Sequence, residues 1–249
     1  MSKKISIKDS IALVSGANRG IGKAITEELL NKGIKKVYAG ARKLESLTEL
    51  KEKYGDRLEL VQLDVTNQAS VDNAAMVASD STMLINNAGV LAHGGYKSEN
   101  MLESINQNME VNVLGVARLT QAVLSNIENK PNATIATVSS VVGLGSMPMM
   151  NGYCTSKAAV HSMIQGLRGE LQDSNVLVSG IYPGPIETDM VKDISEGIEL
   201  DKPENLAKNV VIALEQGEED IFPDVMSAQI KQAYGTTPKE VEKMFSAWK

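Results

Sequence analysis

Residues that hold metals or form disulfides are scarce in this sequence. Among its 249 residues are one cysteine, Cys154, and two histidines. One cysteine cannot form an internal disulfide, and these three side chains are too few for a cluster of His and Cys metal ligands. We therefore expect no metal site, and a reducing compartment, the cytoplasm, as the location.

The sequence also lacks a segment typical of a membrane span or an export signal. Its first residues are basic, but Lys8 and Asp9 interrupt any apolar core before it forms. One long stretch without charge, residues 131–156, contains too many Ser, Thr, Asn, Gly and Pro residues for a membrane-spanning helix. We expect this stretch to be a buried strand with its loop, and we expect no membrane partner.

An excess of positive charge is missing as well. The chain has 25 Lys and Arg against 31 Asp and Glu, which gives a formal net charge of −6. A protein that follows a phosphate backbone needs the opposite sign, so we expect no nucleic-acid partner. What remains is an ordinary globular composition, 43% hydrophobic and 22% charged, in a chain long enough for one large domain.

Short apolar runs rich in Val, Ile and Leu alternate with helical patterns. Such runs are typical of buried parallel strands, because helices cover both faces of a parallel sheet. Gly33 and Gly55 are placed to end helices, and Pro203 is placed to begin one. Without linkers or repeats, the sequence predicts one α/β domain over residues 1–249, a doubly wound parallel sheet in three α/β/α layers. The predicted strands are residues 11–15, 36–41, 58–64, 83–87, 133–140 and 176–182.

A glycine-rich turn follows the first predicted strand. Gly16, Gly20 and Gly22 precede an amphipathic helix that continues from Lys23. Glycines here allow a tight turn and let a pyrophosphate approach the free N–H groups at the helix start. A plain strand-to-helix turn is the alternative, but the further βαβ units favour nucleotide binding.

The end of the second strand indicates which nucleotide is bound. An acid about 20 residues past the glycines binds the ribose 2′-hydroxyl of NAD in the usual fingerprint, and none stands at residues 38–43. Arg42 offers a planar charged group that suits a 2′-phosphate, and Arg19 could approach that phosphate from the other side. These features favour NADP(H) over NAD. The alternative is that Arg42 and Lys43 are solvated charges.

Several motifs together resemble the short-chain dehydrogenase/reductase family. They are Gly-x-x-x-Gly-x-Gly at 16–22, Asn-Asn-Ala-Gly at 86–89, and Tyr153 with Lys157 four residues later, preceded by Ser140 at a distance of 13 residues. The resemblance extends from about residue 11 to about residue 222. It implies a Rossmann-type fold and hydride transfer with a nicotinamide cofactor.

The resemblance also implies which residues contact the cofactor. A pair at the third strand contacts the adenine, the Asn-Asn-Ala-Gly motif lines a ribose, and the Pro183–Gly184 turn meets the nicotinamide carboxamide. The implied set is Gly16, Asn18, Arg19, Gly20, Ile21, Gly22, Arg42, Asp64, Val65, Asn87, Ala88, Gly89, Tyr153, Lys157, Pro183, Gly184, Ile186 and Thr188.

Four residues form the implied catalytic set. A carbonyl that accepts hydride develops negative charge on its oxygen, so a hydroxyl pair must hold this oxygen and deliver a proton. The resemblance assigns the proton to Tyr153 and the orienting hydrogen bond to Ser140. A phenol with a pKa near 10 needs a nearby cation at neutral pH, which Lys157 supplies. Asn112, by the same resemblance, binds a water that links Lys157 to solvent.

The substrate pocket is expected beside this set. We expect residues 91–96, residues 141–150 and a mobile lid, residues 187–202, to line it. Its methionines, Met147, Met149, Met150 and Met190, suit a hydrophobic ligand or are core filler. Six acids in the lid, Glu187, Asp189, Asp193, Glu196, Glu199 and Asp201, are expected to disfavour anionic substrates. Cys154 is expected to fill the pocket wall, and residues 224–249 are expected to form a helical tail.

The sequence thus predicts an NADPH-dependent reductase that transfers hydride to a ketone or aldehyde, a small neutral hydrophobic carbonyl. One alternative is an NADPH-dependent 3-oxoacyl thioester reductase. Another, of a different class, is a catalytically idle NADPH-binding regulator, against which the complete set of four catalytic residues argues. The resemblance further implies a homotetramer or homodimer formed through the helices around Asn112 and Tyr153.

Overall fold

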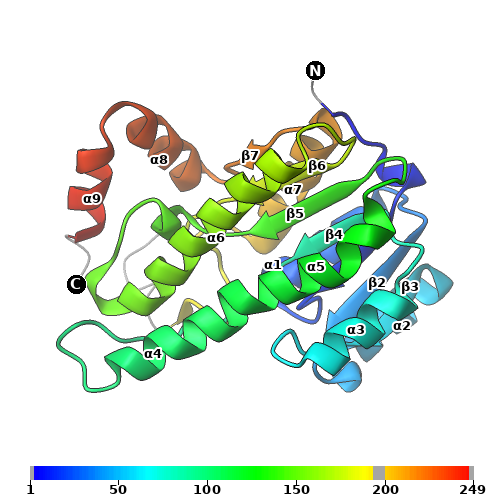
Figure 1. The fold of residues 1–249 in the computed structure, drawn as a ribbon, viewed down its shortest axis with the longest axis horizontal. Coiled ribbons are helices and arrows are strands. Elements are labelled where there is room, and N and C mark those ends of the chain that lie inside the picture. The colour runs from blue at the N-terminus through cyan, green and yellow to red at the C-terminus, as the bar shows by residue number, and fades with distance from the viewer. Residues whose placement is uncertain (1–2, 193–199, 247–249) are drawn as a thin grey trace.

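The computed structural model describes residues 3–192 and 200–246. These residues form a parallel sheet of seven strands in the order β3-β2-β1-β4-β5-β6-β7, flanked by helices (Figure 1). Because the strand order reverses between β1 and β4, the predicted doubly wound α/β fold is confirmed. The strands are β1 (Ile11–Ser15), β2 (Lys36–Ala41), β3 (Leu58–Gln62), β4 (Met83–Asn86), β5 (Thr134–Val138), β6 (Leu177–Ile181) and β7 (Asp220–Ile221).

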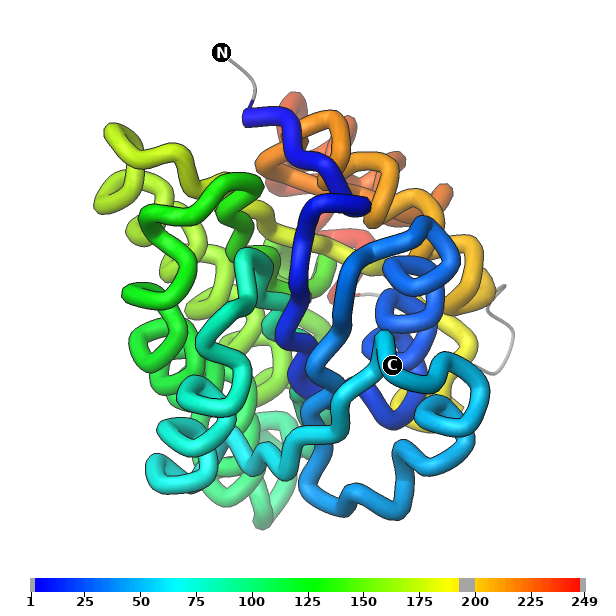
Figure 2. Tube along the Cα trace, turned by 90° about the vertical axis from the view of Figure 1, so that its right-hand side faces the viewer, coloured from blue at the N-terminus to red at the C-terminus, as the bar shows by residue number. Residues whose placement is uncertain are grey.

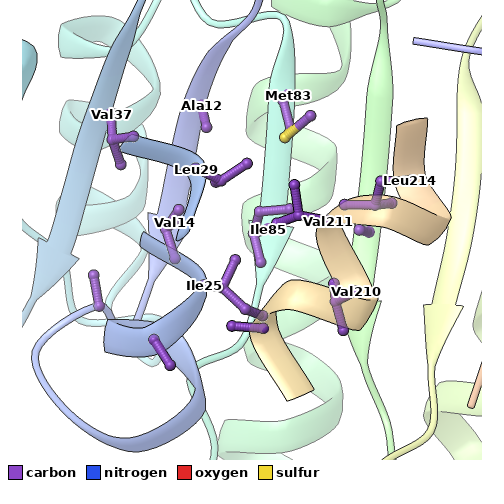
Figure 3. Packing of buried hydrophobic residues seen from close by; sticks show 14 of the residues in the cluster. Ala12, Val14, Ile25, Leu29, Val37, Met83, Ile85, Val210, Val211 and Leu214 are labelled. Carbon is purple, nitrogen blue, oxygen red and sulfur yellow. The ribbon is translucent and has the colours of Figure 1, made fainter. Parts of the chain in front are cut away.

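Each face of the sheet has its own helical layer (Figure 2). Helices α1 (Gly20–Asn31) and α7 (Pro203–Gln216) pack on one face, and α3 (Gln68–Val77), α5 (Gly115–Ile127) and α6 (Asn151–Glu170) pack on the other. Successive residues of a strand point to opposite faces. Ala12 and Val14 therefore join the core under α1 and α7, which Figure 3 shows, while Leu13 joins the core on the other face.

The predicted helix boundaries are confirmed at three positions. Gly33 and Gly55, just beyond α1 and α2 (Thr48–Tyr54), have φ of 84° and 58°, a region that favours glycine. Pro203 is the first residue of α7, where its missing N–H costs no hydrogen bond.

The predicted strands are mostly too long at their carboxyl ends. The predicted runs at 58–64 and 133–140 extend two residues beyond β3 and β5. Leu63 and Ser139 still donate one backbone hydrogen bond each to the neighbouring strand, but the strand pairing ends at Gln62 and Val138. The prediction missed β7 entirely, because two residues at a sheet edge form no apolar run.

A long helical rod lies beside α6 (Figure 1). It consists of α4 (Met101–Asn108), a π-helical turn over Met109–Leu114, and α5. The expected helical tail is present within the described residues as α8 (Val225–Thr236) and α9 (Pro238–Ser246). In the part of the chain that the structure describes, no helix has the length and apolar character needed to cross a membrane.

Candidate active site

Many of the predicted site residues follow the carboxyl ends of four neighbouring strands. Strands β1, β4, β5 and β6 lead into the glycine turn, the Asn-Asn-Ala-Gly segment, Ser140 and the Pro183–Gly184 turn, respectively. Carboxyl ends of parallel strands meet at one edge of the sheet, and the reversal between β1 and β4 opens a crevice there. The fold therefore brings the predicted cofactor and catalytic residues to one edge.

The glycine turn forms a cradle that side chains would fill. Gly16 and Gly20 have φ of 66° and 53°. A Cβ atom on Gly22 would lie 2.2 Å from the Gly16 carbonyl oxygen and 2.3 Å from Asn87 Nδ2. Helix α1 starts within this turn and has no acidic residue in its first turn, so its free N–H groups and its dipole favour an anion. The turn therefore fits the pyrophosphate of a dinucleotide.

Asn87 braces this turn from β4. Its Nδ2 donates to the carbonyl oxygens of Ser15 and Gly16, each at 3.1 Å. The Ser15 hydroxyl oxygen accepts the backbone N–H groups of Asn87 at 3.0 Å and Ala88 at 3.1 Å. These four hydrogen bonds join the chain just after β1 to the chain just after β4. The side-chain nitrogen of Asn87 therefore donates to protein carbonyl groups.

Two arginines lie near the glycine turn, with different partners. Arg42 is exposed at the end of β2, and its charge contributes to a lowered pKa of Asp64, whose main cause is the hydrogen bonds from the N–H and hydroxyl of Thr66. Arg19 Nη1 lies 3.9 Å from the Asp189 carboxylate, with both side chains exposed. Arg19 therefore faces the segment after Thr188, while Arg42 presents its guanidinium at the edge where a 2′-phosphate is expected.

Lys157 is a buried cation beside Tyr153. The two residues lie one turn apart on α6, and Lys157 Nζ is 5.6 Å from the centre of the Tyr153 ring. Lys157 is 6% exposed, and its Nζ donates to the Val138 carbonyl oxygen at 2.9 Å. Burial lowers the pKa of Lys157 to about 8, because removal from water disfavours the charged form.

Tyr153 and Ser140 form the expected hydroxyl pair. Burial raises the pKa of Tyr153, whereas a hydrogen bond with Ser140 opposes this shift, so the phenol holds its proton and is available as an acid. The Ser140 hydroxyl donates to the Pro183 carbonyl oxygen at 3.3 Å and accepts the Val142 N–H at 3.4 Å. A phenol, a second hydroxyl and a cation thus lie together near the end of β5.

Asn112 lies in the π-helical turn between α4 and α5. Its Oδ1 accepts the Val90 N–H at 2.9 Å, and its Nδ2 donates to the Val90 carbonyl at 3.0 Å and to Ser156 Oγ at 2.9 Å. A Cβ on Gly89 would lie 3.2 Å from Asn112 Oδ1 and 3.9 Å from Lys157 Nζ. Asn112 is therefore close to Lys157. Its side-chain oxygen and nitrogen already hydrogen-bond to other protein groups, so the predicted water would have to bind another atom of Asn112.

An apolar cluster adjoins Tyr153 and combines the predicted pocket loop with the C-terminal tail. Within it, Met147 and Met150 are buried core residues, whereas Met149 and Met190 lie outside the cluster and are exposed. The Met147 N–H donates to the sulfur of Cys154, whose pKa is raised by burial, as expected for a wall residue. The buried members of the cluster are Val141, Val142, Met147, Met150, Cys154, Tyr182, Ile230, Val241 and Phe245.

The predicted lid is described only in part, since Asp193, Glu196 and Glu199 lie outside the described residues. Its ends are joined by a hydrogen bond from the Glu187 N–H to the Asp201 carbonyl at 2.9 Å. Asp189 pairs with Lys192 as well as Arg19, so part of the expected negative charge is balanced. A cavity of about 530 Å³ is lined by Glu187, Thr188, Asp189, Lys192, Leu200, Lys202, Pro203 and Glu204.

Two features of this edge were not predicted from the sequence. One is the Val138 carbonyl, which accepts a hydrogen bond from Lys157; a backbone acceptor leaves no sequence signal. The other is Asp224, which accepts the Gly184 N–H at 2.8 Å. The pattern Asp-x-x-Ser at 224–227, before a helical segment, could have indicated a helix cap there.

Known proteins resemble the chain over most of its length. The family model described as "short chain dehydrogenase" matches residues 10–199. The NADPH-dependent 3-dehydrocapnine reductase of Ornithobacterium rhinotracheale is 31% identical, over 95% of this chain and 90% of that protein. The 3-oxoacyl-[acyl-carrier-protein] reductase FabG of Vibrio cholerae is 32% identical, over 77% and 80%. A short chain dehydrogenase from Burkholderia cenocepacia, solved in complex with NADP, has a TM-score of 0.89 at 32% identity, over 97% and 99%.

Proposed function

The chain belongs to the short-chain dehydrogenase family, and we propose that it is an NADPH-dependent reductase that transfers hydride to a ketone or aldehyde. The observation that supports the reaction best is the group of Ser140, Tyr153 and Lys157 at the sheet edge beside the glycine turn. NADP as the cofactor is supported by Arg42 and by the absence of an acid at the end of β2. It is further supported by the NADP-bound and NADPH-dependent relatives.

The residues of this chain divide the work of the reduction. NADPH supplies the hydride when bound; the protein supplies position, charge and the proton. Ser140 and Tyr153 hydrogen-bond the carbonyl oxygen, and the Tyr153 hydroxyl donates its proton to that oxygen as the alcohol forms. The Lys157 cation stabilises the phenolate that remains, and solvent returns one proton for each turnover. Asn112 lies beside Lys157 and supports this return of a proton from solvent.

We propose a small neutral hydrophobic carbonyl as the substrate, since the cluster next to Tyr153 is apolar. A 3-oxoacyl thioester is the second candidate, supported by the similarity to the reductase FabG. NADPH consumption should therefore be measured over neutral ketones, aldehydes, diketones and an acetoacetyl thioester, in parallel with Tyr153→Phe. A thioester turned over far better than a neutral ketone of similar size would replace the first candidate. No turnover with any compound would favour an idle NADPH-binding regulator.

We also propose that residues 1–249 form one domain with a lid at 187–202, and that the protein is cytoplasmic. We further propose that the chain forms a homodimer or homotetramer. The oligomer is proposed to form through the helices around Asn112 and Tyr153, where Leu114 is exposed on the α4–α5 rod. Light scattering of the purified protein tests this. A monomer at micromolar concentration would reject the oligomer.

A further inference from the structure

A buried carboxylate at the start of α8 has both oxygens in use. Asp224 is 7% exposed. Its Oδ1 accepts the Ser227 N–H at 2.9 Å and completes a capping box, while its Oδ2 accepts the Gly184 N–H at 2.8 Å. A helix cap needs one acceptor oxygen, which Asn or Ser supplies as well as Asp. The second oxygen is therefore available for a different task.

The second oxygen holds one edge of a peptide group whose other edge faces the catalytic serine. The Gly184 N–H and the Pro183 carbonyl belong to the same planar unit. The Pro183 oxygen accepts the Ser140 hydroxyl at 3.3 Å and the Val141 N–H at 3.0 Å. Asp224 and Ser140 thus bind opposite edges of one peptide group.

We infer that Asp224 is a positioning residue for Ser140, acting through the Pro183–Gly184 peptide; this inference rests on the proposed reductase function. Because the peptide is planar, fixing its N–H also fixes the direction of its carbonyl. A hydrogen bond to a carboxylate is strong and polarises the peptide, so the carbonyl accepts more strongly as well. Asp224 therefore fixes the Pro183 oxygen that holds the Ser140 hydroxyl, and with it the position from which this hydroxyl turns its one proton to a carbonyl substrate.

The packing around Gly184 is built for this contact. A Cβ atom on Gly184 would lie 2.7 Å from Asp224 Oδ1 and 3.3 Å from the Met226 Cβ, so a side chain there would push the carboxylate away. The loop before Asp224 is fixed from α7 by Asn209 Nδ2, which donates to the Pro223 carbonyl at 2.7 Å. The Asp224 carboxylate is therefore held from two sides, by the start of α8 and by the loop that precedes it.

Asp224→Asn tests the inference, with Ser227→Ala as the matched control. An amide has one acceptor oxygen, so the variant can keep the cap or the Gly184 contact but not both. Ser227→Ala weakens the same capping box and leaves the Gly184 contact intact. We expect Asp224→Asn to lower kcat about 10- to 100-fold with KM for NADPH within about 3-fold, and Ser227→Ala to leave both constants unchanged. An equal loss in both variants would overturn the inference.

A double-mutant cycle with Ser140→Ala tests whether the effect passes through Ser140. Coupled residues give non-additive losses, so Asp224→Asn should cost much less activity once Ser140 is absent. Full additivity would overturn the inference.

Amide hydrogen exchange separates this inference from the proposed function. We expect faster exchange in peptides covering residues 141–145 and 182–186 in Asp224→Asn and unchanged exchange there in Ser227→Ala. If the wild type turns over no carbonyl compound, the proposed function fails, and exchange alone decides whether Asp224 holds the turn. Unchanged exchange in Asp224→Asn would then reject the positioning role.

Discussion

Ser140 and Asp224 bind opposite edges of the Pro183–Gly184 peptide, the hydroxyl at its carbonyl and the carboxylate at its N–H. This relationship joins the hydroxyl of Ser140, the proposed orienting residue, to the cap of α8. Two hydrogen bonds on one rigid peptide group therefore link the region after β7 to Ser140, the predicted orienting residue. It also packs against the predicted pocket loop, where Val241 and Phe245 join Met147 and Cys154.

Tyr153→Phe is expected to abolish most of the reductase activity. The change removes the hydroxyl proton and leaves the ring, so the fold and the cofactor cradle should persist. Loss of a positioned general acid costs about 100- to 10,000-fold in rate. Steady-state kinetics with the best carbonyl substrate measures this loss. Fluorescence titration with NADPH serves as the control and should give a Kd within about 3-fold of the wild type; activity above a tenth of the wild type would contradict the assignment.

Lys157→Met is expected to change how stability depends on pH. The folded pKa of about 8 lies below the usual 10.5, so below pH 8 the folded protein bears the cost of a buried charge. This cost, about 3 kcal/mol at 1.4 kcal/mol per unit, disappears as the pH rises from 8 to 10.5. The wild type without cofactor should therefore gain stability relative to Lys157→Met over this range. Urea unfolding at pH 7 to 10.5 measures the difference.

The control for that experiment is Lys208→Met, because Lys208 is exposed on α7. This variant should track the wild type at every pH. A difference between wild type and Lys157→Met that stays flat with pH would show that Lys157 is not buried as a charge.

Arg42→Asp is expected to reverse the preference between NADPH and NADH. The change removes a cation from the end of β2 and places there the acid that favours an unmodified ribose. Charge-assisted hydrogen bonds contribute about 1.5 to 3 kcal/mol, so kcat/KM for NADPH should fall about 10- to 100-fold while that for NADH rises. Lys43→Ala, its neighbour, should leave the ratio within about 3-fold. An equal effect of both variants would support solvated charges instead.

Gly22→Ala is expected to disrupt the cofactor cradle. The added methyl group would lie 2.2 Å from the Gly16 carbonyl oxygen, so the turn or α1 must shift, at a cost of about 1 to 3 kcal/mol. NADPH affinity should fall at least about 10-fold. Gly166→Ala on α6, where a Cβ would meet nothing within 4 Å, should keep affinity unchanged and stabilise the helix by about 1 kcal/mol. Thermal unfolding and NADPH titration compare the two.

The alternation of apolar runs and helical patterns was sufficient to predict strands β1 to β6 and the helical layers on both faces of the sheet. Apolar runs predict burial, and strands β3 to β6 end one or two residues earlier than the runs that predicted them, as at Val138, where β5 ends before Ser139 and Ser140. The π-helical turn at Asn112 and the acceptor at Val138 depend on backbone hydrogen bonds, which side-chain patterns do not record. The role of Asp224 depends on an amide 40 residues earlier in the chain, and local sequence indicates only its cap.

The same 40-residue separation has a consequence for synthesis. Chains grow at about 5 to 20 residues per second, so the peptide beside Ser140 waits several seconds for the carboxylate that fixes its N–H. During that interval the residues of strands β1 to β6 are already synthesised, while Asp224, whose carboxylate binds the Gly184 N–H, is not. A chain that ends before Asp224 would therefore contain the residues of strands β1 to β7 and lack the carboxylate that binds the Gly184 N–H.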